Sequence, residues 1–151
     1  MVEATLILIL SVALCMFYLQ INCERILRWR LNQQFYHSVV EANGLQFPFV
    51  RKAVEDVGVP VDYWRFRMQL KCDYLALTHL FVCNAKRFSA SEWLFVWELA
   101  MYFRAVLLAL VIAHTLRLNE RAAFLKLTMM LEYFANVVGE RLDTIRTIRF
   151  G

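Results

Sequence analysis

Histidine is the residue type in this sequence best suited to binding a cofactor. Two of the three histidines, His79 in the segment THLF and His114 in the segment AHTL, lie among apolar residues. A neutral imidazole in such surroundings can serve as the axial ligand of a haem or chlorophyll metal, which needs only one such ligand. His79 and His114 are therefore the candidate cofactor-binding residues. A histidine satisfied by hydrogen bonds in a core or at a membrane interface has the same surroundings and is the simpler interpretation.

The cysteines indicate neither a metal centre nor a disulfide framework. None of the four, Cys15, Cys23, Cys72 and Cys83, forms a C-x-x-C pair, and no two histidines have the H-x-x-x-H spacing of a zinc site. If Cys72 and Cys83 share one helix, roughly 16 Å of helical rise separates them, beyond the Cα separation of about 7 Å that a disulfide tolerates. We therefore expect free thiols, no metal site and a reducing compartment.

The motifs of the common enzyme classes are absent from the sequence. It contains no G-x-x-x-x-G-K-[ST], G-x-G-x-x-G, G-x-S-x-G or H-E-x-x-H, and its four glycines are scattered. We name no catalytic residue, and a protein without enzymatic activity is the leading expectation. A membrane-bound enzyme that acts on a lipid substrate stays open as an alternative, because some such enzymes lack short motifs.

The composition indicates a membrane environment for part of the chain. Of its 151 residues, 60% are apolar, well above the usual share of about 45–50%. The net charge of +4, from 17 Lys and Arg against 13 Asp and Glu, is compatible with an anionic membrane surface or an acidic partner. This excess is too small to predict nucleic-acid binding.

The N-terminal segment is predicted to be a transmembrane helix. Twenty residues without a formal charge lie between Glu3 and Glu24, and about twenty helical residues cross a hydrocarbon core of about 30 Å. We place the helix at residues 4–22 and the anchor at residues 1–23. No basic residue precedes the apolar run and no A-x-A arrangement follows it, so we expect the segment to be retained rather than cleaved as a signal peptide.

Three arginines indicate how the anchor is oriented. Arg25, Arg28 and Arg30 follow the apolar run, whereas no Lys or Arg precedes it. Because basic residues stay preferentially on the cytoplasmic side, we expect the N-terminus outside and most of the chain on the cytoplasmic side.

Residues 24–151 are predicted to form one compact, all-α domain, because strand alternation is nowhere sustained. Asp62 is suited to cap the start of a helix, and Ser89 with Glu92 matches a capping box. Gly139 is expected to end a helix. The predicted helices span residues 24–42, 48–57, 62–86, 90–118, 120–138 and 140–149.

The segment of about residues 93–118 has two interpretations. Residues 105–116 carry no charge, and extending them to a span at 98–116 takes in Arg104. An arginine near the end of a span can extend to the interface, so a second membrane-embedded helix is one alternative. The other alternative is the central helix of a bundle, apolar on all sides because it is covered on all sides.

Two charges and two tryptophans of this segment are candidate contacts with a partner. Glu98 and Arg104 lie six positions apart, or about 240° around a helix, so they cannot readily pair with each other. Either they extend to water at one membrane interface, or each has a partner on another helix or chain. Trp93 and Trp97 belong to an aromatic surplus that includes 12 Phe and 6 Tyr. Aromatic residues are enriched at protein interfaces.

Together these features predict a non-catalytic subunit of a membrane protein complex with a structural role. Its expected partners are the lipid bilayer and either other membrane protein subunits or further copies of itself, without nucleic acid. A subunit that binds haem or chlorophyll through His79 or His114 is the alternative from another functional class. The predicted membrane or partner contacts are Arg25, Arg28, Arg30, Trp93, Trp97, Glu98 and Arg104.

Overall fold

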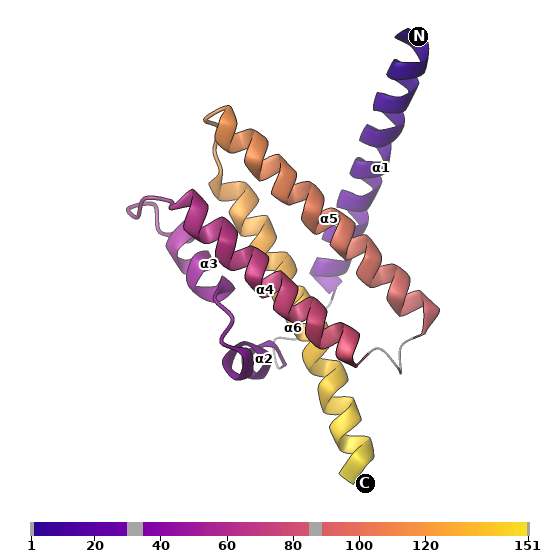
Figure 1. The fold of residues 1–151 in the computed structure, drawn as a ribbon, viewed down its shortest axis with the longest axis vertical. Coiled ribbons are helices and arrows are strands. Elements are labelled where there is room, and N and C mark those ends of the chain that lie inside the picture. Colours follow the sequence, from indigo (N-terminus) through magenta and orange to yellow (C-terminus); the bar gives the residue numbers. More distant parts are fainter. Residues whose placement is uncertain (1, 30–34, 85–88, 151) are drawn as a thin grey trace.

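The computed structural model describes residues 2–29, 35–84 and 89–150, and the regular structure in these ranges is entirely helical (Figure 1). The all-α fold class predicted from the sequence is confirmed. The helices are α1 (Val2–Trp29), α2 (Tyr36–Asn43), α3 (Phe47–Glu55), α4 (Tyr63–Cys83), α5 (Ala90–Thr115) and α6 (Arg121–Phe150).

The central helix of the bundle is α6. Helices α2, α3, α4 and α5 all pack against it, and α1 also contacts it. Residues 130–135 of α6 are buried one after another, so that part of the helix is covered around its whole circumference. The interpretation of residues 93–118 as the central, fully covered helix is therefore wrong. The other elements pack around α6 and leave one face of α5 uncovered.

Aromatic side chains join α4 to α5. The residue numbers of the contacting side chains increase along α4 while those of their partners on α5 decrease. The two helices are therefore antiparallel (Figure 1). Stacked and edge-to-face rings of this kind add to the free energy gained by burying their area. The ring-centroid distances are 3.7 Å for Tyr63 and His114, 4.2 Å for Tyr74 and Phe103, and 5.7 Å for Phe81 and Trp93.

The starts of α4 and α5 follow from local capping. The Asp62 side chain accepts a hydrogen bond from the backbone N–H of Arg65 at 3.2 Å. The backbone N–H of Ser89 donates to the Glu92 carboxylate at 2.8 Å. Each cap satisfies a backbone donor that has no partner within its helix. Both predicted helix starts are correct to within one residue.

Gly139 does not end a helix, and that prediction is wrong. α6 continues through this position, so the predicted helices 120–138 and 140–149 form a single helix. A Cβ atom on Gly139 would lie 2.8 Å from the carbonyl oxygen of Phe35. The glycine therefore serves close packing between α6 and the chain entering α2.

The predicted helix 24–42 corresponds to two helices in the described residues. α1 ends at Trp29 and α2 begins at Tyr36, and residues 30–34 lie outside the described part of the chain. α2 is closed by Gly44, whose φ of 61° is the left-handed conformation of a helix C-cap. The predicted helices 48–57, 62–86 and 90–118 differ from α3, α4 and α5 by at most three residues at either end.

Candidate functional site

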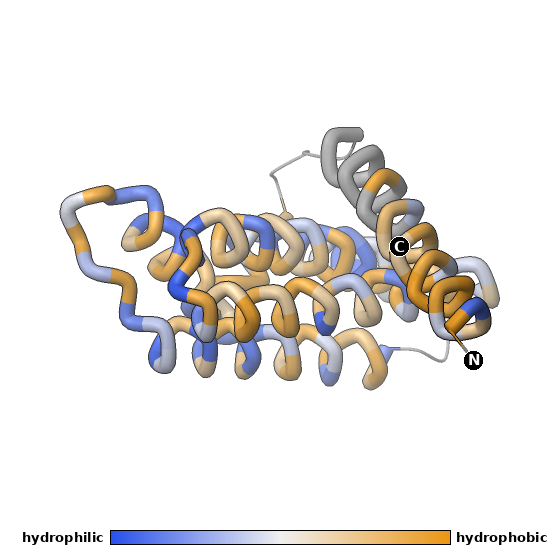
Figure 2. The backbone as a smooth tube through the Cα atoms, turned by 90° about the horizontal axis from the view of Figure 1, so that it is seen from above, coloured by the Kyte–Doolittle hydropathy of each residue, from blue (hydrophilic) through white to orange (hydrophobic). Residues whose placement is uncertain are grey.

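The N-terminal half of α1 projects from the bundle and is apolar on every side (Figures 1 and 2). Leu6, Ile7, Leu8 and Ile9 are consecutive and are exposed by 60, 69, 66 and 64%. Successive residues of a helix are rotated by about 100°, so four consecutive exposed apolar residues cover its whole circumference. None of the other described elements covers this part of α1.

One face of α5 is also apolar and uncovered. We define the outward face of α5 as the side of this helix that carries its exposed large apolar side chains. Its apolar members recur at helical spacing along almost the whole helix and are exposed by 40 to 64%. They are Trp93, Leu94, Trp97, Met101, Leu108 and Ile112.

Among the described residues, α5 is the one helix that is long and apolar enough to span a membrane by length and composition. The described apolar stretch of α1, Val2–Tyr18, is shorter than such a span. The predicted span at residues 4–22 extends past this stretch into residues whose side chains lie outside the description.

Arg104 and Glu98 are placed differently on α5. Arg104 is exposed and interrupts the outward face, whereas Glu98 is half-buried. They do not pair with each other, and neither forms a hydrogen bond or ion pair with a side chain that the structure describes. An arginine in an apolar surface is costly unless it finds an acceptor or reaches water. Arg104 is exposed, so its guanidinium can reach water in the structure.

The arginines that follow the apolar run belong to the end of α1 next to the bundle. Arg25 and Arg28 lie in the last turns of α1, a helix that contacts both α5 and α6. Their side chains, and the whole of Arg30, lie outside the described residues.

The two candidate cofactor ligands are far apart. Nδ1 of His114 lies 2.6 Å from a carboxylate oxygen of Glu120, and its ring stacks on Tyr63 at 3.7 Å. His79 lies on the exposed side of α4, sixteen residues beyond Tyr63 or roughly 24 Å along the helix. Nε2 of His79 lies 3.5 Å from Sγ of Cys83. The histidines therefore cannot share one metal ion, and each has its own protein neighbours.

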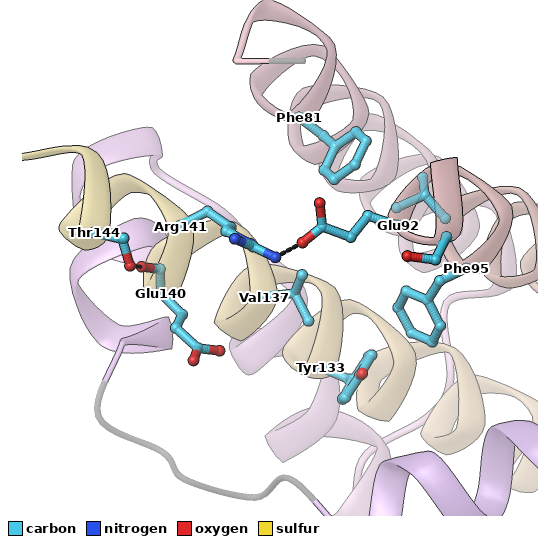
Figure 3. A pocket seen from close by; sticks show the side chains of 10 residues that line it. Phe81, Glu92, Phe95, Tyr133, Val137, Glu140, Arg141 and Thr144 are labelled. Carbon is cyan, nitrogen blue, oxygen red and sulfur yellow. Dashed lines mark hydrogen bonds and ion pairs between the residues drawn. The ribbon is translucent and has the colours of Figure 1, made fainter. Parts of the chain in front are cut away.

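A cavity of about 450 Å³ lies where the end of α4, the start of α5 and α6 meet (Figure 3). Phe81, Phe95 and Tyr133 form part of its apolar wall, and an ion pair between Glu92 and Arg141 crosses it. The ion pair between Glu92 and Arg141 links the first turn of α5 to the second half of α6.

A buried carboxylate that the sequence analysis did not identify holds the start of α3. Asp73 of α4 is 5% exposed and accepts the backbone N–H groups of Gln46 at 2.8 Å and of Phe47 at 2.6 Å. Burial raises the pKa of Asp73, and the two N–H donors oppose this effect. Asp73 replaces the local cap that α3 lacks.

A second contact that the sequence did not predict joins the C-terminal end of α3 to the N-terminal end of α6. Arg121, the first residue of α6, donates from its guanidinium to the carbonyl oxygens of Val54 at 2.8 Å, Asp56 at 2.9 Å and Val59 at 2.8 Å. These carbonyls belong to the last turn of α3 and the chain that follows it, where a cation is favoured. The sequence analysis had no signal for this role, because the partners are distant in the chain.

The pair His79 and Cys83 has the spacing H-x-x-x-C, which neither C-x-x-C nor H-x-x-x-H includes. The spacing H-x-x-x-C places a histidine and a cysteine one turn apart on one helix face just as H-x-x-x-H places two histidines. Among the described residues, no group of three or more His, Cys, Asp or Glu could hold a metal ion.

No protein-family model, no curated protein and no solved structure matches this chain.

Proposed function

We propose that the protein is a membrane-anchored, non-catalytic subunit of a membrane protein complex. In this proposal α1 enters the bilayer, and the bundle around α6 lies beside the membrane and contacts a partner subunit. The observation that carries it is the exposed apolar circumference of α1. Removing one Leu or Ile side chain from water contributes about 1.5–3 kcal/mol, so a run of such residues strongly favours lipid over water.

The proposed orientation places the N-terminus outside and the bundle on the cytoplasmic side. Arg25 and Arg28 lie at the bundle end of α1, and no basic residue lies at its other end. A positive flank on one side only is the arrangement that fixes the direction of a single span.

The outward face of α5 is the proposed contact with a partner subunit. Trp93 and Trp97 provide the large aromatic side chains that are enriched in protein interfaces. Arg104 lies on the same face without a described acceptor, and a partner carboxylate would supply one. Glu132 of α6 is buried and accepts a hydrogen bond from the Arg51 guanidinium at 2.5 Å, so this carboxylate has its partner within the chain.

Site-specific labelling in native membranes tests both contacts. In a background in which the native cysteines are replaced by serine, Leu8→Cys, Leu108→Cys and Val57→Cys each receive an environment-sensitive fluorophore. Val57, 84% exposed between α3 and α4, is the control for a surface in water. Quenchers attached to lipid tails and quenchers dissolved in water are then compared.

We expect the label at position 8 to be quenched from the lipid, the label at position 57 from water, and the label at position 108 weakly from either side. Quenching at position 8 from water would disprove the anchor. Strong lipid quenching at position 108 would show that the outward face of α5 meets lipid instead of a subunit.

A further inference from the structure

We propose that His79 and Cys83 of α4 form one half of a zinc-type metal site, which the same two residues of a second copy of this chain complete. The two side chains lie one helical turn apart and both are exposed. Nε2 of His79 and Sγ of Cys83 are 3.5 Å apart. A neutral imidazole and a thiolate are the ligands that zinc prefers in proteins.

The separation of these two atoms fits one tetrahedral ion. Zinc binds sulfur at about 2.3 Å and nitrogen at about 2.0–2.1 Å. With a tetrahedral angle between the bonds, the two ligand atoms are then about 3.6 Å apart. The observed 3.5 Å therefore allows both side chains to bind the same ion with little rearrangement.

Two ligands leave a tetrahedral ion half coordinated, and the described chain supplies no others. Within the described ranges, no third His, Cys, Asp or Glu joins this pair in a cluster. Structural zinc sites have four protein ligands. Two copies that each provide His79 and Cys83 give such a set of two nitrogen and two sulfur ligands.

The exposed face of α4 is suited to bring two copies together in parallel. Met68, Leu75 and Val82 recur every seven residues and are exposed by 63, 56 and 51%. These three residues occupy one of the two core positions of a heptad repeat, and Cys72 and His79 occupy the other, so the apolar side chains and the metal ligand His79 share one strip of α4. A parallel pair related by a twofold axis places His79 of one copy beside His79 of the other. In Figure 1 α4 crosses in front of α6, whereas α1 passes behind α5, so this face is free of the anchor.

The metal ion is expected to control this pairing. Arg65 and Lys71 are exposed on the flanks of the same face of α4, and like charges oppose the approach of a second copy. The ion offsets this repulsion by joining the copies. The site is independent of the bilayer contact proposed above, because neither residue belongs to α1 or α5.

Metal titration of the full chain in detergent tests the site. The protein is reduced, stripped of metal with a chelator and titrated with Co²⁺, whose absorption spectrum reports thiolate ligation and tetrahedral geometry. Zn²⁺ is then used for the stoichiometry and for light scattering. The variants are His79→Ala and Cys83→Ser, and Cys72→Ser is the matched control, an exposed cysteine of the same helix.

We expect one ion per two chains, a thiolate-to-cobalt band and a dimer that forms only with metal. His79→Ala and Cys83→Ser should each weaken binding at least about tenfold by removing half of each chain's ligands, and Cys72→Ser should bind like the unmodified chain. One ion per chain on a monomer, unchanged binding in Cys83→Ser, or no binding at all would overturn the proposal. If the dimer does not form but the protein still inserts into membranes, the proposed metal site is overturned and the proposed anchor is unaffected.

Discussion

At the scale of single residues, Asp73 shows how a charge that is costly to bury can hold two helices together. Its carboxylate lies inside the bundle because two backbone N–H groups at the start of α3 need an acceptor. α3 has no side-chain cap of its own. The carboxylate thereby couples the position of α3 to that of α4.

Replacing Asp73 tests this coupling. Asp73→Ala leaves two N–H groups without an acceptor and is expected to lower the free energy of unfolding by about 2–4 kcal/mol. Asp73→Asn retains an acceptor oxygen of the same shape and should lose about 1 kcal/mol. Chemical denaturation in detergent measures both values. Equal losses in the two variants would show that the hydrogen bonds are not what Asp73 provides.

The pH dependence of stability gives a second test of Asp73. Its pKa is raised in the folded protein, mainly by burial, above its ordinary value of 3.8. The folded state therefore holds the proton more tightly than the unfolded state. The contribution of Asp73 to stability is full below pH 3.8 and falls as the pH rises through the raised folded pKa.

Asp73→Asn does not titrate, so its stability relative to the unmodified chain should increase across this pH window. Denaturation curves recorded at a series of pH values from below 3.8 to neutral measure the difference. A relative decrease across the window would contradict the raised pKa.

At the scale of the elements, the close packing of Phe35 on α6 depends on the missing side chain at Gly139. In an isolated helix, alanine is favoured over glycine by about 1 kcal/mol. Here the added Cβ would meet the Phe35 carbonyl oxygen at 2.8 Å and its Cβ at 2.9 Å. We expect Gly139→Ala to destabilise the protein by about 1–3 kcal/mol in spite of its better helix propensity.

Gly58→Ala is the matched control for this change. Its added Cβ would meet only a side-chain oxygen of Asp56, at an ordinary distance of 3.4 Å. Thermal unfolding of both variants in detergent makes the comparison. A stabilised Gly139→Ala protein would show that α6 and the segment before α2 do not approach as closely as described.

The contact between α3 and α6 depends on the forked shape of one guanidinium. Arg121 donates to several carbonyl oxygens at and beyond the last turn of α3. Arg121→Ala is expected to cost about 2–4 kcal/mol, because these acceptors lose a charged donor. Arg121→Lys should recover little of this loss, since an ammonium group cannot reach the separate carbonyls in the same way. Full recovery of the unfolding midpoint in Arg121→Lys would show that charge alone is sufficient.

At the scale of the whole molecule, an apolar helix projects from a bundle that has its own core. We expect an epitope tag at the N-terminus to be digested by protease added outside the membrane and protected from protease added on the cytoplasmic side. Arg25, Arg28 and Arg30 are the physical reason, because they favour the cytoplasmic side.

Reversing this charge bias gives the matched test of topology. Changing Arg25, Arg28 and Arg30 to Glu should reduce the fraction of chains with a protected tag. Digestion of the tag from the cytoplasmic side in the unmodified chain would show that the proposed orientation is wrong. An intact mass that lacks residues 1–20 would show that the segment is cleaved.

The sequence by itself determined the helical class and several helix ends. The Asp62 cap and the Ser89 and Glu92 capping box act within one turn, so their effect is present in the local sequence. Apolar spacing likewise indicates which side of a helix is buried. The apolar run of the N-terminal segment is visible in the same way, because it needs no knowledge of any neighbouring element.

Only the tertiary structure decided which helix is central, why Gly139 lies inside α6 and what Asp73 and Arg121 hold. The hydrogen bonds of Asp73 and Arg121 join residues 26 to 67 positions apart. No local pattern encodes such a contact, because the side chain and its partner meet only after the helices have packed. A shared ion likewise depends on the distance between Nε2 of His79 and Sγ of Cys83. The spacing of the two residues in the sequence does not give this distance, which follows only from the side-chain geometry.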